Sequence, residues 1–361
     1  MHRFFVDPNI ARAKTLHTDF YQDADLFELS KQKIFSPAWQ LIGDTGSINK
    51  AGSCYPVTLL ENYLDEPLLL TRDKLDELHC LSNVCTHRGN ILITEPCTAA
   101  NIRCKYHGRM FNLNGDFISM PEFNEVENFP TAEDNLVHLP LFKWNTFLFT
   151  ILKQQYHAEI FFHDMMKRVG WMPLNDLVFR ADLSHVYEVK AHWALYCENY
   201  LEGFHIPFVH ADLNAVIDYG NYTTELFRFS NLQLGLAKDG EDCFDLPAHS
   251  QDFGKNIAAY YFWVFPNMMF NFYPWGVSVN IVIPQTVGIT KVNFLTYMLD
   301  ESKYKKGAGS DLDKVEMEDE AIVQNVQKGI RSSFYKHGRY SVSREKGTHH
   351  FHRLICEYLN T

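Results

Sequence analysis

Two short loops, each with one cysteine and one histidine, constrain this chain more than any other feature of its sequence. Cys85 and His87 stand in the first loop, and Cys104 and His107 stand in the second. Each loop ends in glycine, which permits a tight turn and brings backbone amides close to a bound inorganic group. Two thiolates and two imidazoles can bind either zinc or a [2Fe-2S] cluster in which histidines replace cysteines on one iron.

The spacing favours the cluster over zinc. Zinc sites usually have two cysteines in one knuckle, whereas both loops here are mixed, C-x-H and then C-x-x-H. This is the Rieske pattern, which implies that Cys85 and Cys104 hold one iron and that His87 and His107 hold the other. Neither loop has the additional cysteine of respiratory and photosynthetic Rieske proteins, so both loops resemble the oxygenase type.

The loops are expected to lie in a small all-β domain over residues 36–140. Short strand-like segments alternate there with turn signals, and Asn114-Gly115 is typical of a hairpin turn. A mostly helical lead-in, residues 1–35, is expected to pack on a larger α+β domain over residues 141–361. That domain has strand-like segments followed by a long helical pattern, at 260–264, 277–283, 291–299 and 311–334.

Two histidines in the second half of the chain form another candidate site. His205 and His210 would point about 140° apart on an uninterrupted helix. Pro207 lies between them and is expected to break the helix, so that His210 can turn back. Two histidines and one carboxylate form the facial triad of a non-haem Fe(II) site, which leaves positions open for O2 and substrate.

Together, the two sites resemble the large (alpha) subunit of the Rieske non-haem iron oxygenases over nearly the whole chain. The family has N-W-K, then E-N, an acid and H-x4-H. This sequence matches that order with His192-Trp193-Ala194, Glu198-Asn199, Glu202 and the histidine pair. Ala194 stands where the family has lysine, at a supporting position.

The resemblance implies roles for further residues. The third iron ligand of the family is an aspartate on the late helix, which points to Asp319, with Glu318 as the alternative. Glu202 is expected to bridge a cluster histidine of one subunit to an iron-ligating histidine of the next, and Asn199 is expected near the iron. The fold implied is a Rieske domain plus a helix-grip (START/Bet v 1-like) catalytic domain with an antiparallel sheet and a long late helix.

The resemblance also implies the electron supply and the assembly. NADH electrons are expected to arrive through a separate flavin/iron–sulfur reductase or a ferredoxin, pass from the [2Fe-2S] cluster to a mononuclear Fe(II), and drive hydroxylation, dihydroxylation or demethylation with O2. The chain has no G-x-G-x-x-G after a strand, so direct nicotinamide binding is not expected. A homotrimer is implied, because head-to-tail contact brings one subunit's cluster beside the next subunit's iron.

The substrate class follows less directly from the sequence. The aromatic-rich segment 262–276 resembles the branch that contains choline, glycine-betaine and other quaternary ammonium oxygenases, and ring faces attract such cations. An aromatic-ring substrate is the alternative, because an aromatic wall suits it equally well. Two other classes stay open: an electron-transfer Rieske protein without oxygenase activity, and a zinc-stabilised ligand-binding protein.

Composition bears on location and partners. A net charge of −11 argues against nucleic-acid binding. The most apolar stretch, residues 258–284, is interrupted by asparagines and prolines, so no membrane span is expected. Without a secretion signal, a reducing cytoplasm is expected, in which Cys80 and Cys97 would be buried thiols. The His-rich segment 348–352 is expected to be exposed or at an interface.

Overall fold

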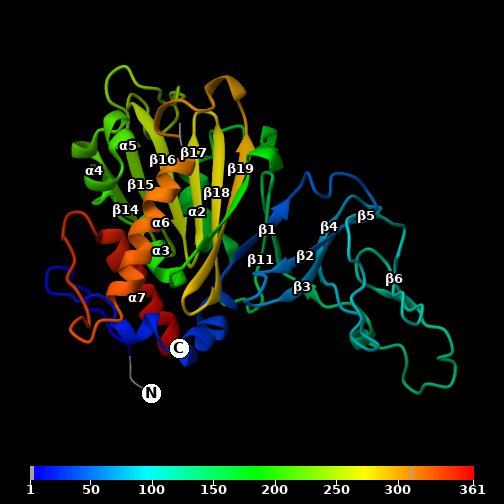
Figure 1. The fold of residues 1–361 in the computed structure, drawn as a ribbon. Helices are drawn as coiled ribbons and strands as arrows, with labels where there is room; N and C mark the ends of the chain where they lie inside the picture. Colours follow the sequence, from blue (N-terminus) through cyan, green and yellow to red (C-terminus); the bar gives the residue numbers. More distant parts are fainter. Residues whose placement is uncertain (1–3, 310–311) are drawn as a thin grey trace. The chain divides into compact units, whose positions relative to one another are not determined.

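A computed structural model describes residues 4–309 and 312–361, and the chain divides into two compact units. The smaller unit is Pro37–Gln154, and the larger joins the N-terminal segment up to Ser36 to Gln155–Thr361 (Figure 1). The boundary therefore differs from the expected one, which placed residues 141–154 in the second domain. Strands β10 (Leu141–Trp144) and β11 (Phe147–Thr150) belong to the smaller unit, because β11 pairs with both β10 and β1 (Gln40–Asp44).

Antiparallel strands form the rest of the smaller unit, in the orders β5-β2-β3-β4-β9 and β6-β7-β8. The predicted hairpin turn at Asn114-Gly115 joins β7 to β8, and Gly115 has a positive φ of 89°. Cys80 is buried as expected, whereas Cys97 is exposed because it lies on the short edge strand β5. The bounds are β2 (Ser53–Leu59), β3 (Glu66–Arg72), β4 (Leu78–Ser82), β5 (Cys97–Thr98), β6 (Ile102–Arg103), β7 (Met110–Phe111), β8 (Phe117–Ser119) and β9 (His138–Leu139).

Within the described residues, the larger unit is built on an eight-stranded antiparallel sheet. The strand order is β12-β19-β18-β17-β16-β15-β14, and β13 also pairs with β19. With the helices around it, this sheet confirms the expected α+β class. The bounds are β12 (Val178–Phe179), β13 (His185–Val189), β14 (Thr223–Leu226), β15 (Ser230–Leu236), β16 (Ile257–Val264), β17 (Met268–Tyr273), β18 (Gly276–Thr286) and β19 (Ile289–Met298).

Helices α3 and α6 carry Asn199 and Asp319 of the second candidate site. Figure 1 shows α6 as the long orange helix, and α3 packs against α6 and against β18. The contact is fixed by Gln327 of α6, whose side-chain oxygen accepts a 2.7 Å hydrogen bond from the backbone N–H of His192. The helices are α1 (Ala24–Ser30), α2 (Ala158–Val169), α3 (Trp193–Tyr200), α4 (Ile206–Val209), α5 (Ala211–Val216), α6 (Leu312–Gly329) and α7 (Lys346–Asn360).

The lead-in and the C-terminal helix both pack on α3. The rings of Phe20 and Tyr21 lie 5.2 and 5.6 Å from the ring of His192, and the Tyr21 hydroxyl donates to Glu198 at 2.7 Å. His349 and His352 of α7 are buried within the larger unit, so the expected exposed or interface position is wrong for these two histidines. None of the described helices is both long and apolar enough to cross a membrane.

Candidate functional site

The two cysteine- and histidine-bearing loops of the smaller unit have the same backbone structure. Gly89 donates a 3.0 Å hydrogen bond to the carbonyl oxygen of Cys85, and Gly108 donates one of 3.0 Å to Cys104. Both glycines have positive φ angles, 72° and 79°, which glycine adopts without the strain of a side chain. Each loop therefore turns back over the same length, although its histidine follows the cysteine by two residues in the first loop and by three in the second.

The four predicted side chains of these loops form a set that fits a [2Fe-2S] cluster. Cys85 and Cys104 are buried in one apolar core, and the ring centroids of His87 and His107 lie 4.9 Å apart. Nδ1 of His107 is buried and has no hydrogen-bond partner among the described residues, as expected for a metal-binding nitrogen. Burial raises the pKa of the Cys104 thiol, but hydrogen bonds from the backbone N–H groups of Tyr106 and His107 lower it, so that the net pKa is lowered and the thiolate is favoured.

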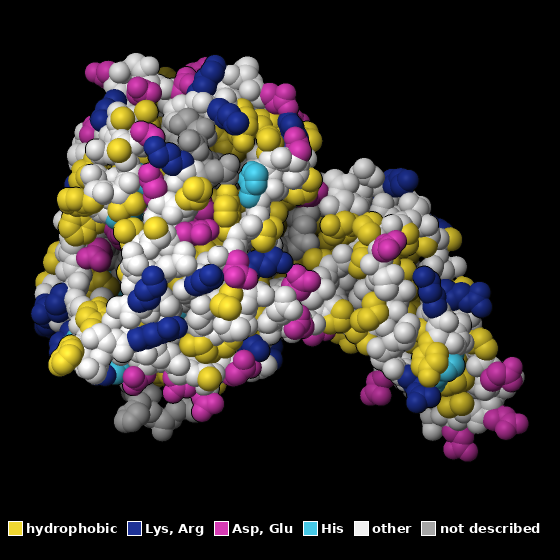
Figure 2. All heavy atoms as spheres, viewed as in Figure 1, with side chains coloured by type: hydrophobic (Ala, Val, Ile, Leu, Met, Phe, Trp, Pro, Cys, Tyr) yellow, Lys and Arg dark blue, Asp and Glu magenta, His cyan; other side chains and the backbone are white. Residues whose placement is uncertain are grey.

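The histidine side of this set reaches the surface. Both imidazole rings are half-buried and Tyr106 is exposed, with the guanidinium carbon of Arg88 6.0 Å from the centre of its ring. Figure 2 shows histidine at the surface of the smaller unit among hydrophobic and basic side chains. An electron donor or acceptor can therefore come closer to the imidazoles than to the buried thiols.

A short helical turn separates the two predicted histidines of the larger unit. His205 directly precedes α4, and His210 lies between α4 and α5. The expectation that Pro207 breaks a helix here is wrong. Pro207 lies in the first turn of α4, where its missing N–H costs no hydrogen bond. The chain changes direction at His210 instead, whose φ and ψ of −109° and 81° are not helical.

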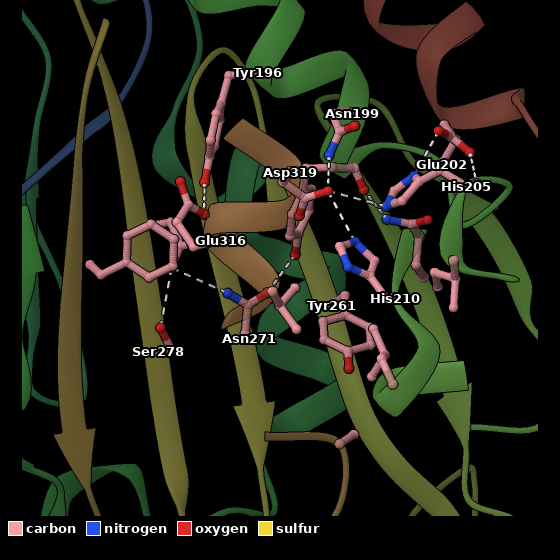
Figure 3. Close-up of a pocket in the computed structure, with 18 of the residues that line it drawn as sticks. Tyr196, Asn199, Glu202, His205, His210, Tyr261, Asn271, Ser278, Glu316 and Asp319 are labelled. Atoms are coloured by element: carbon pink, nitrogen blue, oxygen red, sulfur yellow. Dashed lines mark hydrogen bonds and ion pairs between the residues drawn. The ribbon is translucent and has the colours of Figure 1, made fainter. Parts of the chain in front are cut away.

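This turn brings His205 and His210 to Asp319 of α6. Nε2 of His210 lies 3.0 Å from Oδ1 of Asp319, and Nε2 of His205 lies 3.5 Å from the same oxygen. These three ligand atoms converge closely enough to hold one metal ion, and Figure 3 shows the side chains pointing toward one another. Two nitrogen donors and one carboxylate suit a non-haem Fe(II) site.

The outer nitrogens of both histidines contact a second carboxylate each. Nδ1 of His205 lies 2.8 Å from Glu202, and Nδ1 of His210 lies 2.7 Å from Glu318. A hydrogen bond at Nδ1 fixes the tautomer that leaves Nε2 free to bind a metal. Of the two candidates for the third ligand, Asp319 thus faces the converging Nε2 atoms and Glu318 faces the far side of one ring.

Asn199 lies beside the same three side chains. Its amide nitrogen donates a 2.6 Å hydrogen bond to Oδ1 of Asp319, the oxygen that both histidines approach. Asn199 comes from the last turn of α3, whose packing against α6 is described above. The helix contact therefore sets the direction in which the aspartate points.

A cavity of about 110 Å³ adjoins the converging side chains. Among the described residues that line it, five are tyrosines. Burial raises the pKa of each phenol above its ordinary value, so all five are neutral near pH 7. The tyrosines are Tyr196, Tyr200, Tyr222, Tyr261 and Tyr273.

Comparison with protein families fits both sites. Residues 178–361 match the ring hydroxylating alpha subunit (catalytic domain), and residues 38–130 match the Rieske [2Fe-2S] domain. The chain belongs to the Rieske oxygenase alpha subunits. This Rieske oxygenase is therefore an oxidoreductase whose cofactors are a [2Fe-2S] cluster and a mononuclear iron, and which takes electrons from a separate reductase.

Two curated relatives of this Rieske oxygenase are similar over almost the whole chain. Choline monooxygenase (chloroplastic) of Arabidopsis thaliana is 29% identical over 97% of this chain and 84% of its own. The carnitine monooxygenase oxygenase subunit of Escherichia coli (strain K12) is 26% identical over 97% of this chain and 95% of its own. The expected kinship with quaternary ammonium oxygenases is confirmed.

Solved structures share the fold of this Rieske oxygenase. The quaternary ammonium Rieske monooxygenase CntA in complex with L-carnitine superposes with a TM-score of 0.75 at 23% identity, over 96% of both chains. Naphthalene 1,2-dioxygenase from Rhodococcus sp. bound to indole gives 0.74 at 15% identity, over 96% of this chain and 94% of that one. A lone electron carrier and a zinc-stabilised binding protein are both excluded, because the Rieske and catalytic domains are both present.

Sequence reasoning missed the roles of two carboxylates in the site of this Rieske oxygenase. Glu316 lines the cavity, and Glu318 contacts His210 rather than serving only as an alternative to Asp319. Glu316 precedes Asp319 by three residues, a spacing that puts both on one face of a helix. That spacing is the signal by which the sequence alone could have found it.

Proposed function

We propose that this oxygenase inserts one atom of O2 into a C–H bond of a small quaternary ammonium compound. The overall reaction is R–H + O2 + 2e⁻ + 2H⁺ → R–OH + H2O, with the electrons drawn from NADH through the reductase. The observation that carries the proposal is the set of five neutral tyrosines lining the cavity beside His205, His210 and Asp319. Aromatic faces attract quaternary ammonium groups, which lack N–H donors for hydrogen bonding. The names of the choline and carnitine monooxygenases among its relatives support it.

The ligand roles belong to the same proposal. His205, His210 and Asp319 would hold the mononuclear Fe(II). The two loop cysteines and the two loop histidines, Cys85, His87, Cys104 and His107, would hold the cluster. When bound, the cluster supplies single electrons and the ferrous iron supplies O2 activation at its open positions. Asn199 acts as a positioning residue, because its amide holds the aspartate oxygen that faces both histidines.

Glu202 is proposed to couple the two cofactors between subunits of a homotrimer. Its carboxylate already holds Nδ1 of His205 at 2.8 Å and accepts from the backbone N–H of His205 at 3.1 Å. A carboxylate fixed in this way on one imidazole can accept a hydrogen bond from a second imidazole that approaches from outside. A CntA structure described in terms of inter-subunit electron transfer supports this arrangement. The kind of reductase (flavin/iron–sulfur or ferredoxin-linked) and a cytoplasmic location stay predictions.

The function is tested with purified oxygenase and its matched reductase. Choline, its neutral carbon isostere 3,3-dimethylbutan-1-ol, and benzoate are each supplied under ¹⁸O2, while oxygen uptake and labelled product are measured. For the ammonium compound we expect NADH-dependent oxygen uptake, with one molecule of oxidised product for each O2 consumed. Coupled oxidation of benzoate without oxidation of any ammonium compound would replace the proposal by the aromatic-ring alternative.

A further inference from the structure

The charged side chains of the cavity narrow the substrate class. Among the described residues that line it there are three acids, Glu202, Glu316 and Asp319, and there is no lysine or arginine. Glu202 and Asp319 contact the two histidines and so belong to the metal site. Glu316 instead accepts a 2.6 Å hydrogen bond from the hydroxyl of Tyr196.

Glu316 lies close to the reacting centre. It precedes Asp319 by almost one turn of α6, so the two side chains project from one face of that helix, as Figure 3 shows. Glu316 is only 3% exposed. A bound cation stabilises a buried carboxylate, because little water is present there to solvate the negative charge. An ammonium group held here would keep its own methyl groups and its neighbouring carbon near the metal site.

Another part of the lining is polar but neutral. Asn271 of β17 and Ser278 of β18 are paired in the sheet, and the Ser278 hydroxyl donates to Oδ1 of Asn280 at 3.1 Å. The amide of Asn271 approaches the same oxygen at 3.4 Å. These groups can donate to and accept from a hydroxyl group. They offer no positive charge to a carboxylate.

We propose that Glu316 is a specificity-determining residue that selects a net cation and rejects a zwitterion. The substrate would be a quaternary ammonium compound with a hydroxyl group and no carboxylate, seated with its ammonium group against Glu316 and the tyrosines. This inference rests on the proposed function and narrows it. A betaine of the same size, with its ammonium group against Glu316, would find no lysine or arginine in the described lining to pair with its carboxylate.

Three ligands of nearly equal size separate the possibilities. Choline is a cation, glycine betaine is a zwitterion, and 3,3-dimethylbutan-1-ol is the neutral isostere of choline. Their binding is measured by isothermal titration calorimetry without reductase, so that no turnover occurs. We expect choline to bind about 10- to 100-fold more tightly than either of the other two, the range that corresponds to one charge-assisted contact.

Variants of the carboxylate complete the test. Glu316→Gln keeps the oxygen that accepts from Tyr196 and removes the charge, so it should weaken choline binding about 10- to 100-fold and leave the neutral isostere almost unchanged. Glu316→Asp should retain the preference for choline. Glu320→Gln removes the same charge from the same helix outside the cavity lining and serves as the control. Circular dichroism and iron content check that each variant is folded.

The outcomes distinguish this inference from the proposed function. If glycine betaine binds as tightly as choline, or if Glu316→Gln weakens all three ligands equally, the inference is overturned while an ammonium substrate stands. If the neutral isostere binds as tightly as choline, the cavity does not recognise the ammonium charge, and the proposed function fails together with the inference.

Discussion

His192, at the start of α3, should make the larger unit sensitive to mild acid. Its side chain caps the helix by accepting a 3.3 Å hydrogen bond from the backbone N–H of Ala194, and the rings of Phe20, Tyr21 and Phe27 surround it. Burial lowers its pKa from 6.5 to about 3. The unfolded chain therefore takes up a proton between these two pH values, whereas the folded chain does not.

The sign and size of the effect follow from this difference. Because the unfolded state binds more protons below pH 6.5, the free energy of unfolding falls as the pH falls through that value. One pKa unit corresponds to about 1.4 kcal/mol, so His192 alone should remove about 2 kcal/mol between pH 7 and pH 5. The loss should continue toward pH 3 and level off below it.

The measurement compares the protein with His192→Asn, because asparagine also caps helices well and does not titrate in this range. Urea unfolding at pH 7, 6 and 5 is followed by tryptophan fluorescence, to which Trp193, buried next to His192, contributes. The variant should lose about 2 kcal/mol less than the protein between pH 7 and pH 5. Equal losses would show that His192 is not held neutral, and the account of this helix start would be wrong.

Four further substitutions address the candidate metal site and its cavity. Asp319→Ala should lower the iron content from about three to about two atoms per chain with the cluster spectrum intact. Glu318→Gln should lower the affinity for the mononuclear iron only about 10- to 100-fold. Full iron retention in Asp319→Ala would move the third ligand elsewhere. Glu202→Gln should keep both cofactors by metal analysis and electron paramagnetic resonance but slow coupled oxygen uptake at least about 10-fold, and normal turnover would exclude its coupling role. Gly203→Ala would bring a Cβ within 2.5 Å of the ring of Tyr222, so stability measured by thermal unfolding should fall by about 1–3 kcal/mol and the KM for substrate should rise. Unchanged values in Gly203→Ala would mean that Tyr222 moves aside without cost.

The two loops with cysteine and histidine were readable from sequence because their geometry is local. A cysteine, a histidine and a glycine within five residues determine a turn whatever surrounds it, and two such turns indicate one cofactor. The family assignment and its cofactors were accessible for this reason. The shared helix face of Glu316 and Asp319 also follows from a local spacing of three residues, but sequence reasoning singled out Asp319 and missed Glu316.

Features that depend on contacts between distant segments were not readable in the same way. The strand pattern of 147–150 is plain, but nothing local states that it pairs with β1 rather than with the larger sheet. Pro207 is compatible with either the end or the start of a helix, and in the structure it lies at the start of α4. The burial of His352 depends on α3 and the lead-in, which supply Glu198 and Tyr21 as partners at 3.0 and 3.5 Å.

The matched loops of the smaller unit have a consequence for how the protein is matured. With the proposed ligands, each iron takes one side chain from the Cys85–Gly89 loop and one from the Cys104–Gly108 loop, so neither loop can retain an iron by itself. Loading should then be all-or-none: a preparation would contain complete and empty molecules, with few that carry a single atom. Damage to either loop would empty the whole centre rather than half of it.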